Sequence, residues 1–486
     1  MSKYKIFKKA VFIAVSLVCI CAVVYAIWDN GGFLPGWIEW KYCTLYDSEK
    51  KYEITLMDRK VSVYFDSALI WTSSDEIKVQ DIISCDMDND KEDELILLCW
   101  KIGRYGSHRP FWVERDEKKW SQHIFVYEYG NDSIHSKWMS SYIGQDVASL
   151  SVNEDAAGRS RLLLSTPGGD LSCWRWDSWG FVKEDTDVSF TVFGDNIIHE
   201  PIYIYGLNNG GSFDFLFDDI KDIVAQSDVA VINQETPLTD DPDMYSGYPR
   251  FATPIEVGEA ISDAGFDIVT CATNHALDKG VEGVNTTKSF FDTNNIVCLG
   301  IQSEEESDYS PYTTIVKGGI RFALFNYTYG TNGMKIPEDS PYMVHLLDDE
   351  NRVREDMEKA KNDADFIIVF VHWGTEYSQQ PDDFQKKWAE IFLDCKVDVV
   401  VGTHPHTLQP YEVISDDSGH DMLIYYSIGN FVSAQPEESC IKGGMARFTV
   451  SLTAEGYGIT EYVLEPLEIM RSNDGRYTAT PCDELK

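Results

Sequence analysis

The chain has 486 residues, of which 43% are hydrophobic and 13% aromatic, and this composition excludes a disordered protein. Its length exceeds that of a usual single domain of about 100–200 residues, so we expect more than one domain. The 41 Lys and Arg residues against 80 Asp and Glu residues give a formal charge of -39 at pH 7. Because affinity for nucleic acid comes from neutralising phosphates, this charge excludes a nucleic-acid partner.

A basic segment followed by an apolar run opens the chain. Residues 10–28 are apolar apart from Ser16, four lysines precede them, and Asp29 follows. Such a run is just long enough to cross the hydrocarbon core as a helix, and the positive-inside rule leaves residues 1–9 in the cytoplasm. We therefore expect a single-pass membrane anchor at residues 10–28, with the bulk of the chain outside the cytoplasm. The alternative is a signal peptide that is cleaved after Ala26.

Nine cysteines follow this segment, an odd number without any C-x-x-C pair. Several of them, such as Cys271 and Cys298, lie inside apolar runs. Buried free thiols fit this pattern better than a disulfide framework.

Residues 42–182 show short strand-like runs between polar turns and no helical period, which predicts a small all-β domain. A weak internal repeat relates 71–98 to 138–164, since each copy has a Trp, an alternating strand, an acidic turn and a second apolar strand. A complete β-propeller needs at least four blades. The segment is too short for that, so we expect a partial, propeller-like domain.

The first repeat contains an acidic turn whose side chains have the spacing of a calcium loop. Alternate oxygens at positions 1, 3, 5 and 9 of such a loop converge on a hard cation. The turn resembles the calcium loops of FG-GAP-type propeller repeats, although Lys91 stands where those loops have Gly. A calcium site and a solvated acidic turn both remain open for these four residues: Asp86, Asp88, Asp90 and Glu94.

From residue 188 onwards, strand-length apolar runs alternate with helix-length amphipathic segments. This alternation predicts a layered α/β domain with a buried sheet at 188–433, followed by a C-terminal β extension at 434–486. The expected strands are 188–194, 229–235, 268–273, 297–301, 322–327, 366–373, 397–402 and 423–428. The expected helices are 213–225, 255–264, 281–294, 351–363 and 382–395.

Polar residues follow six of these strands. In open α/β folds ligands bind at the carboxyl ends of strands, so we expect these side chains to meet at one edge. Carboxylate, imidazole and amide groups together suit Mn²⁺, Fe²⁺ or Zn²⁺, and their number exceeds what one tetrahedral ion needs. Two ions are therefore expected, an arrangement that recurs in phosphoryl-ester hydrolysis. The residues are Asp195, His199, Glu235, Asn274, His275, His372, His404, His406 and Asn430.

The motifs around these residues resemble, in order and spacing, those of the CapA (poly-γ-glutamate synthesis) family, a branch of the calcineurin-like metallophosphoesterase superfamily. The resemblance covers residues 188–433. It departs from the family pattern at Gln234, where an apolar residue is usual, and at Thr273, where Asn is usual. The motifs are GDNIIH, INQETPL, ATNHALDKG, HWGTEYSQQP, VVGTHPHTLQPYEV and YYSIGNFV.

The resemblance implies a layered metallophosphoesterase-like sheet domain with two bound divalent metal ions. His275 would protonate a leaving group or stabilise developing charge, and Asp278 would cap the following helix. The implied metal ligands are Asp195, Glu235, Asn274, His372, His404 and His406, with His199 as a seventh.

The function expected from these features is that of a membrane-anchored, extracytoplasmic metal-dependent hydrolase in the biosynthesis or export of a cell-surface polymer such as poly-γ-glutamate capsule. The expected partners are that polymer or its membrane synthetase complex. Two alternatives remain: a phosphoesterase acting on another phosphate-containing envelope substrate, and a non-catalytic scaffold of a capsule-export complex.

Overall fold

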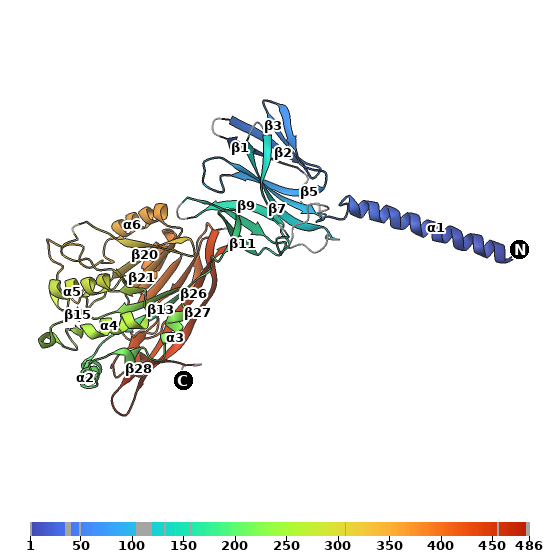
Figure 1. The fold of residues 1–486 in the computed structure, drawn as a ribbon. Coiled ribbons are helices and arrows are strands. Elements are labelled where there is room, and N and C mark those ends of the chain that lie inside the picture. The colour runs from blue at the N-terminus through green and yellow to red at the C-terminus, as the bar shows by residue number, and fades with distance from the viewer. Residues whose placement is uncertain are drawn as a thin grey trace. The chain divides into compact units, whose positions relative to one another are not determined.

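The computed structural model describes residues 2–34, 40–47, 50–103, 119–130, 133–140, 142–155, 158–306, 308–453 and 456–482. The chain divides into two compact units, Met1–Asp185 and Thr186–Lys486, and each is described by itself (Figure 1).

The apolar run at the N-terminus forms the long helix α1 (Ser2–Asp29). Among the residues that the structure describes, no helix has an apolar stretch long enough to cross a membrane. The expected anchor at 10–28 is therefore not supported. The end of α1 is fastened to the first unit, because the indole N–H of Trp120 donates to the Trp28 carbonyl at 2.8 Å.

Within the described residues, the rest of the first unit forms three four-stranded antiparallel sheets, each with its strands in chain order, which agrees with the expected small all-β domain. The first contains β1 (Trp40–Asp47), β2 (Lys50–Met57), β3 (Lys60–Phe65) and β4 (Ala68–Thr72). The second contains β5 (Ile77–Cys85), β6 (Glu94–Lys101), β7 (Ser121–Gly130) and β8 (Ser133–Met139). The third contains β9 (Ser149–Glu154), β10 (Ser160–Ser165), β11 (Leu171–Asp177) and β12 (Gly180–Glu184).

Strand β6 explains how these sheets pack. Successive side chains of a strand point to opposite faces. Leu95 and Leu97 belong to one buried cluster, with residues of the first sheet, whereas Ile96 and Leu98 belong to another, with residues of the third. The second sheet is thus covered on both faces, which accounts for its continuous apolar run.

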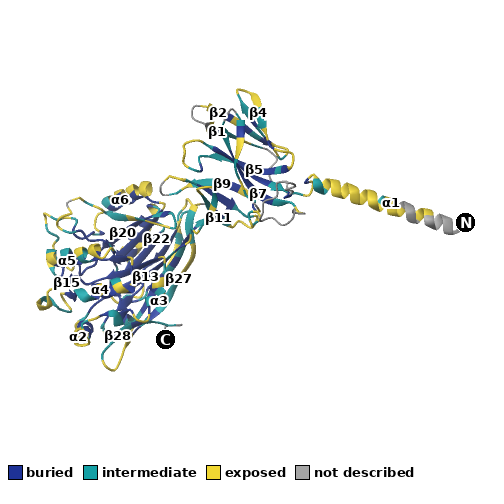
Figure 2. Ribbon diagram, viewed as in Figure 1, coloured by how far each residue is buried: buried dark blue, intermediate teal, exposed yellow. Residues whose placement is uncertain are grey.

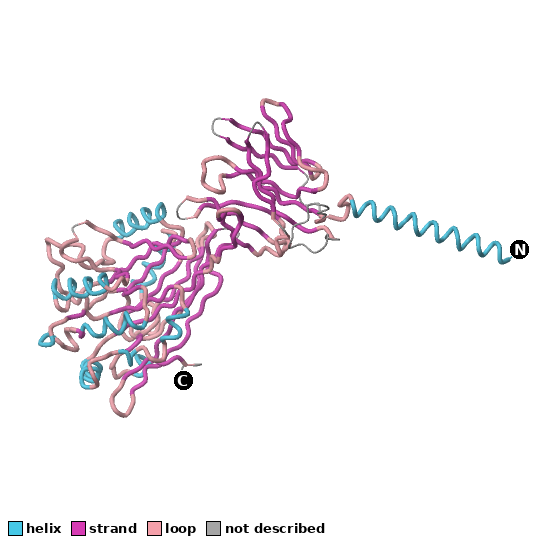
Figure 3. The backbone as a smooth tube through the Cα atoms, in the orientation of Figure 1, coloured by secondary structure: helices cyan, strands magenta, loops and turns pink. Residues whose placement is uncertain are grey.

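The second unit contains two larger sheets (Figures 1 and 3). One has the order β18-β17-β14-β13-β26-β27-β28, with β25 also paired to β13; the other has the order β19-β20-β21-β22-β24-β23. The first comprises β13 (Val188–Asn196), β14 (Val229–Gln234), β17 (Ile268–Thr270), β18 (Val297–Leu299), β25 (Asn430–Val432), β26 (Lys442–Thr453), β27 (Gly456–Arg471) and β28 (Tyr477–Pro481). The second comprises β19 (Tyr312–Lys317), β20 (Ile320–Thr328), β21 (Phe366–His372), β22 (Val399–Thr403), β23 (Tyr411–Ser415) and β24 (Asp421–Tyr425).

Helices cover the outer faces of the two sheets, and the inner faces pack on each other. Phe190 of β13 and Phe322 of β20 meet edge to face at 5.1 Å in the shared core, and Figure 2 shows these sheets as the most buried part of the unit. The helices are α2 (Glu200–Asn208), α3 (Lys221–Gln226), α4 (Ile255–Ala264), α5 (Gly280–Thr293), α6 (Glu350–Asp363) and α7 (Asp383–Asp394). Short elements are η2 (Asp214–Leu216), η3 (Pro242–Met244), η4 (Glu438–Ile441) and the pair β15 (Leu238–Thr239) and β16 (Thr253–Pro254).

Several features differ from the sequence expectation, among them the unexpected strands β19 and β23 and the division of the strands between two sheets. The helix expected at 213–225 is divided into η2 and α3, and α2 was not expected. Strands β26, β27 and β28 of the expected C-terminal extension are an integral part of the sheet that contains β13, because 445–450 of β26 pair antiparallel with 188–193 of β13.

Gly194 positions the end of β13. A Cβ atom at this residue would lie 1.9 Å from the carbonyl oxygen of Gly429, so only glycine allows the chain before β25 to approach so closely. This approach aligns Asp195 with Asn430 in the β13–β25 pairing.

Candidate metal centre

Polar side chains from both sheets meet at the carboxyl ends of their parallel strands. His406 Nδ1 lies 3.1 Å from Asp195 Oδ2. His372 Nε2 lies 3.0 Å from Asn274 Oδ1 and 3.2 Å from His404 Nδ1. These five residues are separated by up to 211 positions in the chain and are all buried. The strand ends therefore converge as the sequence pattern predicts.

Asp195 is held in place by the backbone and side chains around it. The amide of Asn233 donates to Asp195 Oδ1 at 2.7 Å, and the backbone N–H of His404 donates to Oδ2 at 3.1 Å. Asn233 is itself fixed by the hydroxyl of Thr270, which donates to its Oδ1 at 2.8 Å. The carboxylate consequently has one orientation, with Oδ2 also facing His406.

Glu235 gives the clearest indication that the residues fit a metal ion. Its side chain is 1% exposed, and neither carboxyl oxygen accepts a hydrogen bond from any described residue. Oε1 lies 3.9 Å from His372 Nε2, and Oε2 lies 4.0 Å from His406 Nδ1. Burial, with the neighbouring charge of Asp195, raises the pKa of Glu235 well above its ordinary value. A buried carboxylate without donors is costly unless a cation balances it, so this site suits a divalent ion.

The imidazoles of His372 and His404 are in the protonation state that metals bind. Burial and the neighbouring ring of His404 lower the pKa of His372 well below its ordinary value, and burial does the same for His404. Neutral imidazole is the form that coordinates a metal. Thr403 Oγ1 lies 2.9 Å from His372 Nδ1 and so fixes the orientation of that ring.

The turn that carries His404 and His406 is strained. Their φ angles are 96° and 59°, in the left-handed region that non-glycine residues rarely adopt. Such strain is maintained only where the surrounding structure imposes it, and it concentrates at functional sites.

His199, expected as a seventh ligand, lies beside the cluster and outside the groups of side chains that could hold a metal among the described residues. The backbone N–H of Ala434 donates to its Nδ1 at 3.2 Å, and a neutral ring that accepts there carries its proton on Nε2. Binding of a metal through Nε2 would require the other tautomer, in which Nδ1 donates to the Ile197 carbonyl at 3.3 Å. Burial lowers the pKa of His199 to about 4, so the ring is neutral. Its metal-binding role stays a prediction.

His275 and Asp278 form a buried pair. His275 Nδ1 donates to Asp278 Oδ2 at 2.7 Å, and the same oxygen accepts the backbone N–H of Phe251 at 2.7 Å. The expectation that Asp278 caps the next helix is wrong, because α5 has Lys279 at its N-cap position and no side-chain cap. The carboxylate instead fixes the imidazole with Nδ1 protonated, which leaves Nε2 for a reacting group.

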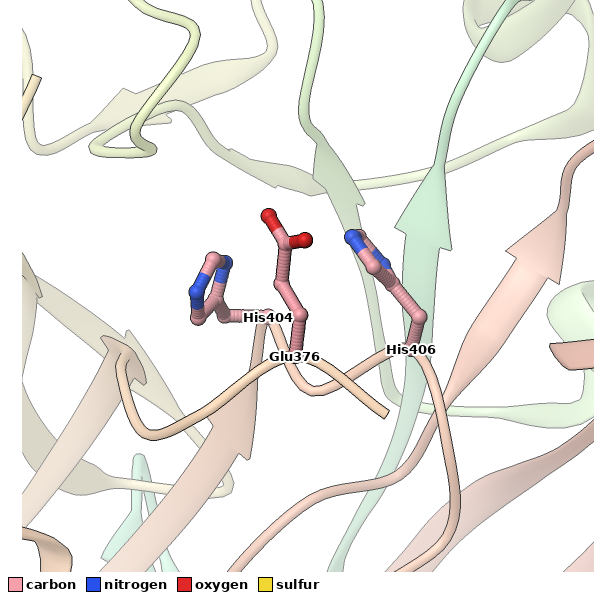
Figure 4. A group of neighbouring side chains, drawn as sticks. All are labelled: Glu376, His404 and His406. Atoms are coloured by element: carbon pink, nitrogen blue, oxygen red, sulfur yellow. The ribbon is translucent and has the colours of Figure 1, made fainter. Parts of the chain in front are cut away.

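The ligand atoms fall into two groups, each within 4.8 Å. One contains Asp195, Glu235 and His372, and the other contains Glu376, His404 and His406. Figure 4 shows the carboxyl group of Glu376 between the two imidazole rings. Sequence reasoning missed Glu376, although it lies in the HWGTEYSQQP motif, four residues after His372.

The acidic turn of the first unit forms ion pairs with a lysine of β8. Lys137 Nζ lies 2.6 Å from Asp88 Oδ2 and 2.6 Å from Glu94 Oε1. Asp86 accepts the backbone N–H groups of Asp90 and Lys91, the latter with a φ of 76°.

The oxygens of Asp86, Asp88 and Asp90 also lie within 4.8 Å of one another, a spacing that could hold a metal. A calcium ion would compete with the ammonium group of Lys137 for Asp88. Calcium binding here therefore stays a prediction.

Solved structures that match part of this chain include a calcineurin-like phosphoesterase and a phosphatase. The phosphoesterase YfkN of Bacillus subtilis is 14% identical, with a TM-score of 0.34 over 58% of this chain and 90% of that chain. A phosphatase of Mycoplasma pneumoniae is 13% identical, with a TM-score of 0.36 over 59% of this chain and 94% of that chain. Similarity at this level supports no functional inference.

Sequence relatives are closer in identity. The "PGA biosynthesis protein CapA" of Bacillus subtilis (strain 168) is 28% identical over 282 residues, 55% of this chain and 71% of the relative. The "Capsule biosynthesis protein CapA" of Bacillus anthracis is 26% identical over 260 residues, 52% of this chain and 61% of the relative. The family described as "Bacterial capsule synthesis protein PGA_cap" matches residues 189–435, half of the chain, and this protein belongs to that family.

Proposed function

We propose that this protein is a metal-dependent hydrolase that acts in the biosynthesis of a bacterial capsule polymer such as poly-γ-glutamate. The observation that carries the proposal is the buried carboxylate of Glu235, which accepts no hydrogen bond from the part of the chain that the structure describes and lies between His372 and His406. Membership of the capsule-synthesis family supports the choice of polymer. The polymer or its synthetase complex is the proposed partner.

The metal would be held by the residues that converge at the sheet edges. Divalent ions bound there would supply a Lewis acid and lower the pKa of water. Asp195 and Glu235 would contribute carboxylate oxygens, while His372, His404 and His406 would contribute neutral nitrogens. Asn274 would contribute its amide oxygen, which already faces His372 Nε2.

His275 would deliver a proton during the reaction. In hydrolysis of a γ-glutamyl amide, water adds to the carbonyl carbon, the C–N bond breaks, and the departing nitrogen takes up a proton. The pairing of Nδ1 with Asp278 leaves Nε2 to donate that proton, and the negative charge of Asp278 stabilises the charged ring. Asp278 thus acts through His275.

The experiment combines metal analysis with two assays. Purified protein is analysed for Mn, Fe and Zn and then tested for cleavage of poly-γ-glutamate and of a generic phosphodiester. Asn274→Ala and His404→Ala should lose metal, whereas His420→Ala, a control in the same unit whose ring bonds the Val397 carbonyl, should retain it.

Each outcome selects one function. Metal together with γ-glutamyl cleavage supports the proposal. Turnover of the phosphodiester alone favours an envelope phosphoesterase. Bound metal without turnover of either substrate favours a non-catalytic scaffold. Wild-type protein that binds none of the three metals would refute the hydrolase.

We also propose, from the basic and apolar pattern of residues 1–28, that the bulk of the chain acts outside the cytoplasm. Protease added to intact cells lacking a cell wall should digest a tag at the C-terminus. Protection of that tag until the cells are lysed would refute this location.

A further inference from the structure

An exposed arginine lies beside the buried pair of His275 and Asp278. The backbone N–H of Phe251 donates to Asp278 Oδ2 at 2.7 Å, and the same oxygen accepts from His275 Nδ1 at 2.7 Å. The peptide carbon of Arg250 is bonded to that Phe251 nitrogen, so it lies within roughly 4 Å of Asp278 Oδ2. Arg250 is exposed, whereas both members of the pair are buried. Its long side chain therefore starts next to the proposed proton donor.

The loop that carries Arg250 is fixed by its own backbone and by the site. Ser246 and Ala252 exchange backbone hydrogen bonds of 3.2 and 2.9 Å. The hydroxyl of Ser246 donates to the Arg250 carbonyl at 2.8 Å. The ring of Phe251 meets His275 edge to face, with centroids 4.8 Å apart. These contacts hold the loop against the imidazole and leave the guanidinium group of Arg250 at the surface.

This guanidinium group has no partner in the part of the chain that the structure describes, although three exposed aspartates precede it in the same segment. These aspartates are Asp240, Asp241 and Asp243. The other arginines of the second unit each form an ion pair or pack on an aromatic ring: Arg321, Arg352, Arg354, Arg447, Arg471 and Arg476. Arg250 is therefore available to an anion from outside the chain. A planar guanidinium group suits a carboxylate, because it donates two parallel hydrogen bonds to its oxygens.

The chemistry of the proposed reaction brings a carboxylate to this position. In poly-γ-glutamate the nitrogen of each amide bond is attached to an α-carbon that carries a free carboxylate. The departing nitrogen takes its proton from His275 Nε2 in the proposed reaction, so the adjacent carboxylate comes close to the same residue. The negative charge of Asp278 alone would repel that carboxylate. A cation beside the pair offsets this repulsion, and Arg250 is the residue placed to supply it.

We propose that Arg250 binds the carboxylate of the residue that leaves when a γ-glutamyl bond is cleaved. The inference rests on the proposed function, since it takes the substrate class and the proton donor from it. Arg250 thereby selects substrates with a carboxylate next to the scissile amide nitrogen. It contacts the leaving residue and no metal ligand, so the metal content of the protein does not depend on it.

Two substrates that differ only in this carboxylate test the proposal, γ-glutamylalanine and γ-glutamylalaninamide. Wild type should cleave the acid with a kcat/KM roughly 10- to 100-fold above that of the amide, as expected for hydrogen bonds to a charged group. Arg250→Gln should lose this preference, mainly through a higher KM for the acid. Arg250→Lys should keep part of it, because an ammonium group retains the charge without the paired donors.

Lys317→Gln is the matched control. Lys317 is exposed and pairs with Ile320 at the start of β20, at the edge of the sheet opposite the metal centre. This variant also removes one positive charge and should keep the wild-type preference.

Binding of a fluorescent γ-linked glutamate oligomer is measured on the same full-length proteins, because it does not depend on turnover. Arg250→Gln should raise the Kd at least about 10-fold, since it removes a charged hydrogen-bond donor. Lys317→Gln should bind like wild type.

A wild type without preference for the acid, or an equal loss of both substrates in Arg250→Gln, would overturn the role of Arg250. Oligomer binding that Arg250→Gln leaves unchanged, or that both variants weaken equally, would do the same. Oligomer binding that depends on Arg250, without cleavage of any γ-glutamyl compound, would refute only the proposed hydrolase. Wild-type protein that neither binds nor cleaves γ-glutamyl compounds would overturn both proposals.

Discussion

The pairing of His275 with Asp278 leads to a prediction about proton transfer. His275→Gln keeps a polar side chain of similar size but removes the proton donor at Nε2. Loss of a general acid costs about 10²–10⁴-fold in turnover, equivalent to about 2.7–5.4 kcal/mol of transition-state stabilisation. Neither residue coordinates metal in the proposed arrangement, so the metal content should remain that of wild type.

Asp278→Asn separates the charge of Asp278 from its hydrogen bonds. The asparagine oxygen can still accept from both His275 Nδ1 and the Phe251 N–H, so the fold should be preserved. Turnover should nevertheless fall by about 10-fold or more, because a neutral amide no longer stabilises the charged ring. The double variant should be no slower than His275→Gln alone, since Asp278 acts only through His275.

Turnover of γ-glutamyl substrate, metal content and melting temperature are measured for the three variants and for His420→Gln as a control. Additive losses in the double variant would show that Asp278 has a separate role. Wild-type turnover in His275→Gln would refute proton donation. If His275→Gln lowers the melting temperature together with turnover, the loss of turnover reflects instability. His275 then only packs against Phe251, whose ring centroid lies 4.8 Å from its own.

Two further predictions concern stability. Lys137→Met should destabilise the first unit by about 3 kcal/mol, since it leaves Glu94 and its neighbours without their cation. Burial raises the pKa of Glu94 to about 7, so this carboxyl is protonated at pH 5 and ionised at pH 8. The loss of unfolding free energy should therefore be larger at pH 8. Equal losses in urea unfolding at both pH values would contradict this. Gly194→Ala should lower stability by more than about 3 kcal/mol and reduce metal content, because its Cβ atom would collide with Gly429. Gly330→Ala, where a Cβ atom meets open space, is the control, and similar melting temperatures for both variants would contradict the role of that close contact.

The sequence predicted most of the candidate site because the site depends on strand ends. The runs that end at His372 and His404 are parallel neighbours, β21 and β22, and such strands must bring their carboxyl ends to one edge. The division into two sheets was not predictable in this way. A buried strand reads as a continuous apolar run whichever sheet it belongs to.

The residues that sequence reasoning missed or misassigned depend on contacts between distant segments. Asp278 lies just before α5, where a cap is the usual local role, yet the Phe251 N–H, 27 residues upstream, competes for its carboxylate. Lys137, which pairs with Glu94 of the acidic turn, lies 43 residues further along the chain. Glu376 lies close to the histidines because its loop is tied to their turn, where the backbone N–H of Tyr377 donates to the Pro405 carbonyl.

The charge of the whole chain would affect how the proposed polyanionic substrate reaches this centre. A net charge of -39 repels poly-γ-glutamate, and the attraction of a metal centre acts only at short range. Raising the ionic strength from about 0.01 M to 0.15 M shortens the screening length from about 30 Å to about 8 Å, which weakens the repulsion before it weakens contacts inside the site. Turnover of the polymer at low concentration should therefore rise several-fold with salt, whereas turnover of an uncharged γ-glutamyl amide should change little. Salt that slows the polymer reaction would instead show that a local positive surface attracts the polymer, and the repulsion argued here would then be wrong.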